Sequence, residues 1–195
     1  MFTLVVGARR SGKSTFAERL AACLEEEAHL PVTYVATARP DHPEMLERIR
    51  AHRARRPPAW ETLEPDAWRP EALPAALESL AQERLVLLDE ASLWVATCLD
   101  AWAETGPGAG VAEAAYRRLL ARLVRALAGR RAPAVVVSGE AGAGIVPPDP
   151  GARRFVDWLG RLNQELAAEA GRVVWMVAGL PLAVKGELPE CARAR

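Results

Sequence analysis

The sequence lacks an excess of charge of either sign, since 25 acidic and 25 basic residues balance among its 195 residues. A chain without a net positive field has no general means of gathering a long polyanion, which argues against nucleic acid as its partner. A local basic pocket for a small anion is compatible with this balance. We therefore expect a small-molecule ligand.

Long hydrophobic runs are also missing. The apolar start at residues 2–6 is too short for the core of a signal peptide, and no segment approaches the roughly 18 apolar residues of a membrane span. The sequence therefore predicts a soluble, cytoplasmic protein that does not span a membrane.

Cysteine and lysine are both scarce. Cys23, Cys98 and Cys191 are far apart and form no CxxC pair, so we expect no structural zinc site and interpret the cysteines as reduced thiols. Only two of the 25 basic residues are lysines, Lys13 and Lys185. A lysine in a chain that otherwise uses arginine indicates a site that needs a compact ammonium group.

Short apolar runs do alternate with longer segments of helical periodicity. The runs are rich in β-branched residues, as in strands that are buried on both faces. This alternation predicts an α/β fold, with a mostly parallel sheet flanked by helices in a single domain that spans residues 1–195. We expect strands at 3–6, 32–36, 85–89, 134–138 and 173–178, and helices at 15–27, 43–55, 72–83, 92–103, 111–128 and 152–170.

Two loops are rich in glycine and proline, GPGAG at 106–110 and GEAGAGIVPPDPG at 139–151. The first is interpreted as a plain connection between helices. The second follows the end of an expected strand, where open α/β sheets bind ligands, so it is either part of a site or a structural loop.

The most specific motif is GARRSGKS at 7–14, which matches GxxxxGK[ST] between an expected strand and an expected helix. Gly7 and Gly12 allow the backbone to turn so that successive amide groups face a phosphate. Lys13 can reach the β- and γ-phosphate oxygens, and the Ser14 hydroxyl suits Mg²⁺. The motif predicts a P-loop NTPase-like fold that binds a nucleoside triphosphate. The expected phosphate-binding residues are Gly7, Ala8, Arg9, Arg10, Ser11, Gly12, Lys13 and Ser14.

An acidic residue follows the buried run LVLLDE at 85–90. Asp89 or Glu90 ends this strand, where Mg²⁺ and its water ligands need a carboxylate. We take Asp89, together with Ser14, as the candidate metal site. A simpler alternative is that this acidic residue caps the next helix and has no metal role.

The segment RIRAHRARRPPAW at 48–60 places one of only three histidines among five arginines. Like charges at helical spacing repel one another by roughly a few tenths of a kcal/mol per pair, so an anion that neutralises them is a natural explanation. If a helix begins at Asp41 or Pro43, then Met45, Ile49 and His52 share one face and the imidazole points toward the protein body.

Cationic neighbours keep an imidazole neutral near pH 7, because they disfavour its protonated form. A neutral imidazole beside phosphate-binding arginines is a candidate nucleophile toward phosphorus. His52 and Lys13 are therefore the candidate catalytic residues. A basic helix face with an incidental histidine is the simpler alternative, and we expect His29 and His42 to lie on the surface.

Taken together, these segments resemble a known family. The P-loop, YVAT at 34–37, the histidine helix, LLDEASLWV at 87–95 and VVVSGEAGAGIVP at 135–147 follow one another as in the bifunctional adenosylcobinamide kinase/adenosylcobinamide-phosphate guanylyltransferases of cobalamin synthesis. The resemblance covers nearly the whole chain. It implies phosphorylation of the aminopropanol hydroxyl of adenosylcobinamide with ATP or GTP. It then implies transfer of GMP from a second GTP, which gives adenosylcobinamide-GDP and pyrophosphate.

In this family the histidine of the RIxxH pattern becomes guanylylated, and that position is His52 here. The resemblance also implies Mg²⁺, GTP and ATP, the corrinoid substrates adenosylcobinamide and adenosylcobinamide phosphate, and a homotrimer. The chain departs from the usual family pattern at Gly139, where Asn is common, and at Glu90 to Ser92, where Cys-Leu-Thr is usual. Further implied nucleotide-site residues are Ala36, Thr37, Ala38, Arg53, Ala54, Arg55, Arg56, Glu64 and Asp89.

Two other functions are compatible with the residues themselves. A regulatory or binding ATPase would use the P-loop for switching and the arginine helix as a partner surface. A small-molecule kinase would lack the GMP-transfer step.

Overall fold

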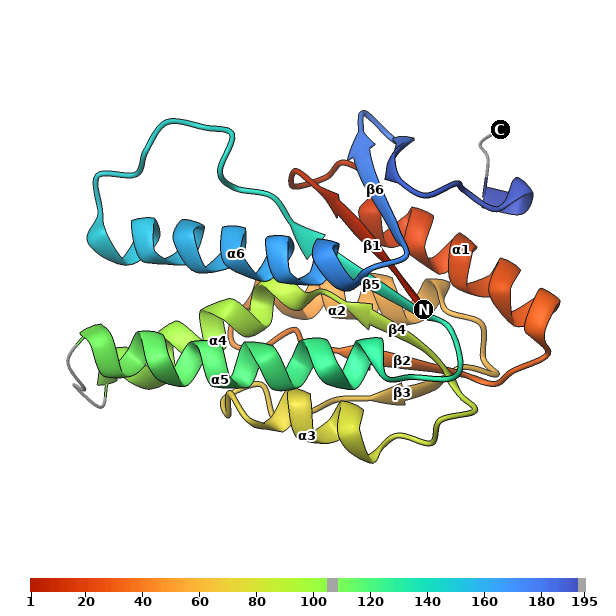
Figure 1. Cartoon of the computed structure of the whole chain (residues 1–195), viewed down its shortest axis with the longest axis horizontal. Coiled ribbons are helices and arrows are strands. Elements are labelled where there is room, and N and C mark those ends of the chain that lie inside the picture. The colour runs from red at the N-terminus through yellow and green to blue at the C-terminus, as the bar shows by residue number, and fades with distance from the viewer. Residues whose placement is uncertain (105–108, 193–195) are drawn as a thin grey trace.

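The computed structural model describes residues 1–104 and 109–192, which form a seven-stranded sheet with helices on both faces (Figure 1). The strand order is β3-β2-β4-β5-β1-β6-β7, and of the described strands only β7 runs antiparallel to its neighbour. The predicted α/β fold with a mostly parallel sheet is therefore confirmed. The strands are β1 (Phe2–Gly7), β2 (Val32–Ala36), β3 (Glu61–Leu63), β4 (Leu85–Asp89), β5 (Ala134–Gly139), β6 (Arg172–Val177) and β7 (Leu180–Lys185). The helices are α1 (Lys13–Ala28), α2 (Pro43–Arg55), α3 (Ala72–Ser79), α4 (Ala91–Glu104), α5 (Ala109–Ala128) and α6 (Pro150–Glu169), followed by a 3₁₀ turn at Glu190–Ala192.

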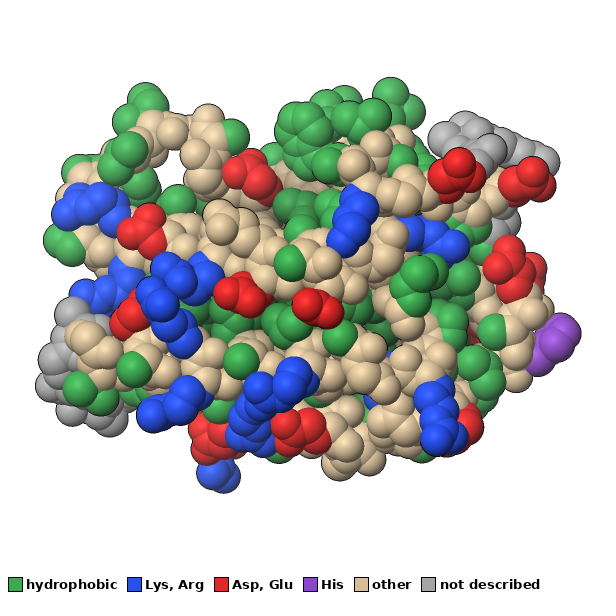
Figure 2. Space-filling view, in the orientation of Figure 1, with side chains coloured by type: hydrophobic (Ala, Val, Ile, Leu, Met, Phe, Trp, Pro, Cys, Tyr) green, Lys and Arg blue, Asp and Glu red, His purple; other side chains and the backbone are tan. Residues whose placement is uncertain are grey.

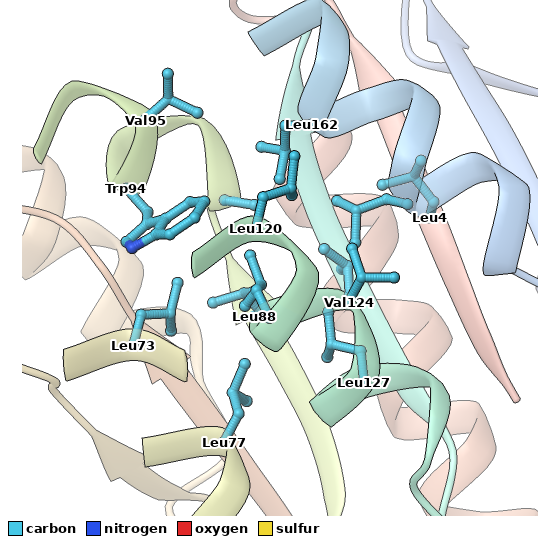
Figure 3. Close-up of a cluster of buried hydrophobic side chains, with 14 of the residues drawn as sticks. Leu4, Leu73, Leu77, Leu88, Trp94, Val95, Leu120, Val124, Leu127 and Leu162 are labelled. Atoms are coloured by element: carbon cyan, nitrogen blue, oxygen red, sulfur yellow. The ribbon is translucent and has the colours of Figure 1, made fainter. Parts of the chain in front are cut away.

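Two hydrophobic cores lie on opposite faces of the central strands. Successive strand residues point to opposite faces, so Leu88 and Val136 pack in the core beneath α3 to α6, while Leu87 and Val137 pack against α1. Figure 3 shows the first core, in which leucines of α3 and α5 meet Leu88 and Trp94. Burial on both faces explains why these strands are continuous apolar runs.

The carboxyl ends of β1, β2, β4 and β5 lie at one edge of the sheet because these strands are parallel. Four segments with polar or flexible residues leave the sheet there. They are the P-loop after β1, Thr37 after β2, Glu90 after β4 and Glu140 after β5. Topology alone thus gathers the motifs found in the sequence at one edge.

Two strands were not predicted. Strand β3 has only three residues, none of them buried, so it lacks an apolar signal. Strand β7 follows a tight turn at Ala178 and Gly179, which both have positive φ. It contains Pro181, which argues against an internal strand but is tolerated at the sheet edge, where β7 lies.

The ends of several helices differ from the prediction by one or two residues, and α3 ends at Ser79, four residues early. The expected loop at 106–110 falls largely outside the described residues. His29 and His42 are exposed, as expected, and His42 caps α2 by accepting a hydrogen bond from the Met45 amide.

The cysteines only partly follow the prediction. Cys98 is a free, buried thiol, and burial raises its pKa. Cys23 is disulfide-bonded, so the expectation of reduced thiols is wrong at this position. The spacing of the three cysteines in the sequence gives no sign of this bond. No helix in the described part of the chain combines the length and the hydrophobicity that a membrane span requires.

Candidate active site

The P-loop connects β1 to α1 in a tight turn that only particular residues allow. Gly12 has φ +92°, and α1 begins at Lys13, so free amide groups of the helix start face the loop. A Cβ on Gly7 would lie 2.7 Å from the Met176 carbonyl oxygen, so this position permits nothing larger against β6. The Lys13 ammonium donates to the Ala8 carbonyl at 3.0 Å and is thereby held over the loop. The result is a cradle for phosphate oxygens.

Asp89, at the end of β4, makes polar contacts with three side chains from three different elements. Its Oδ1 accepts a hydrogen bond from the Ser14 hydroxyl at 3.0 Å, and its Oδ2 accepts one from the Tyr34 hydroxyl. The same Oδ2 lies 3.3 Å from Nδ1 of His52. Burial alone would raise the pKa of Asp89, but hydrogen bonds from His52, Tyr34 and Ser14 lower it below its ordinary value. Asp89 is therefore held as a buried carboxylate.

His52 lies on the face of α2 that turns toward the sheet, as its spacing from Met45 and Ile49 predicts. Its nearest charged groups are Asp89 and Glu18, whose Oε1 is 4.0 Å from Nδ1. The expectation of a cationic surrounding is therefore wrong for the closest neighbours. Helical periodicity placed the arginines beside His52 but gave no information on which side chains α1 and β4 present to it.

Two of the four arginines of α2 form ion pairs with carboxylates outside the helix. Arg55 pairs with Glu18 at 3.3 Å, and Arg53 pairs with Glu64. Arg56 lies 3.4 Å above the centre of the Tyr34 ring, a cation–π contact. These contacts connect the C-terminal end of α2 to β2 and α1.

A cavity opens between α2 and the ends of β2 and β4, and a larger cavity adjoins it along the P-loop. The first is lined by seven predicted site residues, Ser14, Ala36, Ala38, His52, Arg56, Glu64 and Asp89. The second adds Arg9, Arg10, Ser11, Gly12, Lys13 and Arg55. Five further predicted residues line neither of these cavities, namely Gly7, Ala8, Thr37, Arg53 and Ala54.

Three residues at the site were not singled out from the sequence. Glu18 lies one helical turn after Ser14 on α1, a spacing that could have indicated it. Tyr34 is a core residue of β2 whose hydroxyl reaches Asp89, and strand patterning gives no sign of that contact. Arg48 lines both cavities.

Several of these groups could hold a cation. Ligand atoms of Glu18, His52 and Asp89 all lie within 4.8 Å of one another. The Ser14 hydroxyl lies beside the Asp89 carboxylate, and hard oxygen donors of this kind suit Mg²⁺.

Comparison with known proteins identifies the family of this chain. The family described as "Cobinamide kinase / cobinamide phosphate guanyltransferase" matches residues 3–184. The chain belongs to this family. It is 42% identical over 191 residues to the bifunctional adenosylcobalamin biosynthesis protein CobP of Pseudomonas aeruginosa, covering 96% of this chain and 99% of that one. It is 35% identical over 189 residues to CobU of Escherichia coli, a protein of the same description, covering 95% and 100% of the two chains.

A solved structure supports the fold. The flagellar accessory protein FlaH of Methanocaldococcus jannaschii superposes with a TM-score of 0.52 at 13% identity, covering 99% of this chain and 80% of that one. At this identity the likeness concerns the fold alone.

Proposed function

We propose that this chain phosphorylates the aminopropanol hydroxyl of adenosylcobinamide with ATP or GTP. It then transfers GMP from GTP, through guanylylated His52, to adenosylcobinamide phosphate. The products are adenosylcobinamide-GDP and pyrophosphate. Membership of the family supports both reactions. The observation that carries the residue assignment is the position of His52, which lines the P-loop cavity with Nδ1 3.3 Å from Asp89.

The phosphates are bound by the P-loop. Amide groups of residues 8–14 and the Lys13 ammonium hold the β- and γ-phosphates, which form the pyrophosphate leaving group of the second reaction. The α-phosphate then lies toward the mouth of the loop, where α2 passes. Holding nucleophile and phosphorus in one cavity replaces a bimolecular encounter.

The orientation of the His52 ring decides which nitrogen attacks. Because Nδ1 faces the Asp89 carboxylate, it carries the proton, and the lone pair is on Nε2. Nε2 forms a bond to the α-phosphorus while the bond from that phosphorus to its bridging oxygen breaks. Pyrophosphate leaves, and Asp89 stabilises the positive charge that develops on the ring. A phosphate oxygen of the corrinoid then displaces Nε2, which recovers its lone pair.

Mg²⁺ fits the pair formed by the Ser14 hydroxyl and Oδ1 of Asp89, which are 3.0 Å apart. An ion bound there would neutralise charge on the phosphates. This assignment leaves Oδ2 of Asp89 for His52.

The rest of the first cavity is proposed to hold the guanosine. Ala36 and Ala38 leave room beside β2, and Arg56 and Glu64 present hydrogen-bonding groups to the same space. Thr37 acts indirectly, since its hydroxyl is engaged by the backbone of Glu90.

We further propose that the protein forms a homotrimer. This proposal is supported by the resemblance to the family.

The test is incubation with GTP labelled in the α-phosphate. Wild-type protein is expected to retain an acid-labile, base-stable label, whereas His52→Ala retains none. His29→Ala is the matched control, because this exposed histidine at the far end of α1 should leave labelling unchanged. Wild-type protein without label, yet with nucleotide-dependent binding to a partner, would favour a regulatory ATPase. Transfer of γ-phosphate alone to the corrinoid would reveal a kinase without the second reaction.

A further inference from the structure

The larger cavity has an apolar wall that the nucleotide does not explain. Beyond the P-loop it is lined by Leu93 and Ala96 of α4 and by Phe155 and Leu159 of α6. The polar groups Glu90, Ser92 and Glu140 lie among its other lining residues. A cavity that joins a phosphate cradle to an apolar wall is suited to an acceptor with an apolar body and a reacting hydroxyl.

The two cavities contain five carboxylates, and four of them are already engaged. Glu44 pairs with Arg9, and Glu64 pairs with Arg53. Glu140 accepts hydrogen bonds from the backbone amides of Gly142 and Ala143. Asp89 is held by Ser14, Tyr34 and His52.

Glu90 differs from these four because it alone among the five lines both cavities. Within the described residues its carboxylate, like that of Glu140, has no cationic partner, and it accepts only the hydrogen bond of the Ser92 hydroxyl, at Oε1. The other oxygen, Oε2, is therefore available to a ligand in the cavity. A carboxylate with a free oxygen beside a phosphate cradle is placed to accept a proton from an attacking hydroxyl.

Three contacts hold Glu90 in this position. The Thr37 hydroxyl accepts from the Glu90 amide at 3.0 Å and donates to the Glu90 carbonyl at 2.7 Å. Ser92 fixes one carboxylate oxygen. Gly139 leaves the necessary space, since a Cβ there would lie 3.3 Å from Oε1 of Glu90 and 3.2 Å from the Ser92 hydroxyl.

We propose that Glu90 is the general base of the phosphorylation step, at an acceptor site between α4 and α6. This inference rests on the proposed function. The acceptor hydroxyl gives its proton to Oε2 of Glu90, and its oxygen forms a bond to the γ-phosphorus. The bond from that phosphorus to the β–γ bridging oxygen breaks, and the nucleoside diphosphate leaves. Glu90 then returns the proton to solvent.

The experiment compares the two reactions in one protein. Glu90→Gln preserves shape and removes the base, so phosphorylation of cobinamide from γ-labelled ATP should fall by about 10²-fold or more in kcat. KM for cobinamide should change far less. Guanylylation of His52 from α-labelled GTP needs no proton acceptor at this position. The fall in the guanylylation rate of this variant should therefore be at least tenfold smaller than the fall in its phosphorylation rate. Glu90→Asp should recover part of the rate.

Glu169→Gln is the matched control, because it makes the same change at an exposed position near the end of α6. Unfolding curves of both variants check that they are folded. Phosphorylation by Glu90→Gln at the wild-type rate, or an equal loss in both reactions, would overturn the proposal. Failure of the wild-type protein in both reactions would instead refute the proposed function on which it rests.

Discussion

The two oxygens of Asp89 have different partners, and this division organises the site. Oδ1 meets the Ser14 hydroxyl on the P-loop side, whereas Oδ2 meets His52 and Tyr34 on the α2 side. A single carboxylate thereby links the phosphate cradle to the candidate nucleophile. Because it is buried and accepts three hydrogen bonds, it holds its neighbours in a fixed arrangement.

The His52 adduct is predicted to form on Nε2. The contact with Asp89 places the proton on Nδ1, so only Nε2 has a lone pair for the α-phosphorus. Nuclear magnetic resonance of ¹⁵N-histidine-labelled protein after reaction with GTP distinguishes the two phosphoramidates by their coupling to ³¹P. An adduct on Nδ1 would show that the imidazole ring rotates away from Asp89 before it reacts.

Gly139→Ala is predicted to impair phosphorylation selectively. The added methyl would press on the Glu90 carboxylate and the Ser92 hydroxyl, which must then move away from the acceptor. We expect the phosphorylation rate to fall by about tenfold, with guanylylation changed much less. Gly144→Ala in the following loop is the control, because a Cβ there meets nothing within 4 Å. Equal phosphorylation rates in Gly139→Ala and Gly144→Ala would show that a methyl group at position 139 does not displace Glu90.

Sequence reasoning found the residues that carry motifs but not their contacts. Lys13 and Ser14 could be predicted because the P-loop pattern is specific for phosphate binding, and Asp89 because it ends a buried strand. His52 could be predicted because its spacing from Met45 and Ile49 places it on the inner face of a helix. The departures from the family pattern at Glu90 and Gly139 had no explanation until β4 and β5 placed them in contact. Pairings of this kind depend on strand order, which one sequence does not reveal.

At the scale of elements, α2 differs from the other helices around the site. All of its residues are described and none is buried, whereas α1 buries Phe16, Ala17 and Leu20 among others. Polar contacts hold α2 instead, including Arg9 with Glu44 and Arg55 with Glu18. Exposed ion pairs contribute little and weaken with salt. The helix that carries the candidate nucleophile is therefore the loosely held one.

We predict that backbone amides of α2 exchange with deuterium faster than those of α1. Opening α2 exposes little apolar surface, so its free energy of opening is small. Guanylylation of His52 should slow exchange in α2 specifically, because the adduct ties the helix to the nucleotide site. Mass spectrometry of exchanged peptides measures both effects. Equal protection of the two helices before reaction would contradict this account.

Element boundaries could be predicted where local chemistry marks them. Helix α2 begins at Pro43 and ends at Arg55 as expected, because proline at the first helical position is a strong start signal. Strand β7 was missed because Pro181 argues against a strand unless its position at the sheet edge is known. Edge position is a property of the whole sheet.

At the scale of the molecule, Asp89 should contribute to the pH dependence of stability. Its pKa is lowered in the folded state, so the unfolded chain binds the proton more tightly. This stabilisation is present above the ordinary aspartate range and is lost as the pH falls through the folded-state pKa. Asp89→Asn should therefore lower the free energy of unfolding by about 1–3 kcal/mol at pH 7 and by less at pH 3. Urea unfolding at both pH values measures the difference, and an equal loss at both would contradict it.

The proposed homotrimer needs a surface, and the β6–β7 hairpin offers one. Trp175 pairs with Leu182 and Val177 with Leu180, and all four side chains are at least 44% exposed. Figure 2 shows hydrophobic side chains gathered over this end of the sheet. Exposed apolar patches of this kind mark contacts between proteins.

Leu182→Glu is predicted to weaken the assembly, because a charge would be buried without a partner at the contact. Sedimentation equilibrium at micromolar concentration should show a trimer for the wild-type protein and a shift toward the monomer for the variant. Val111→Glu on α5 is the control, since Val111 is equally apolar and 60% exposed but lies outside the hairpin. A variant that remains trimeric would place the contact on another surface. A monomeric wild type would remove the homotrimer from the proposed function while leaving the guanylylation chemistry of His52 to stand on its own test.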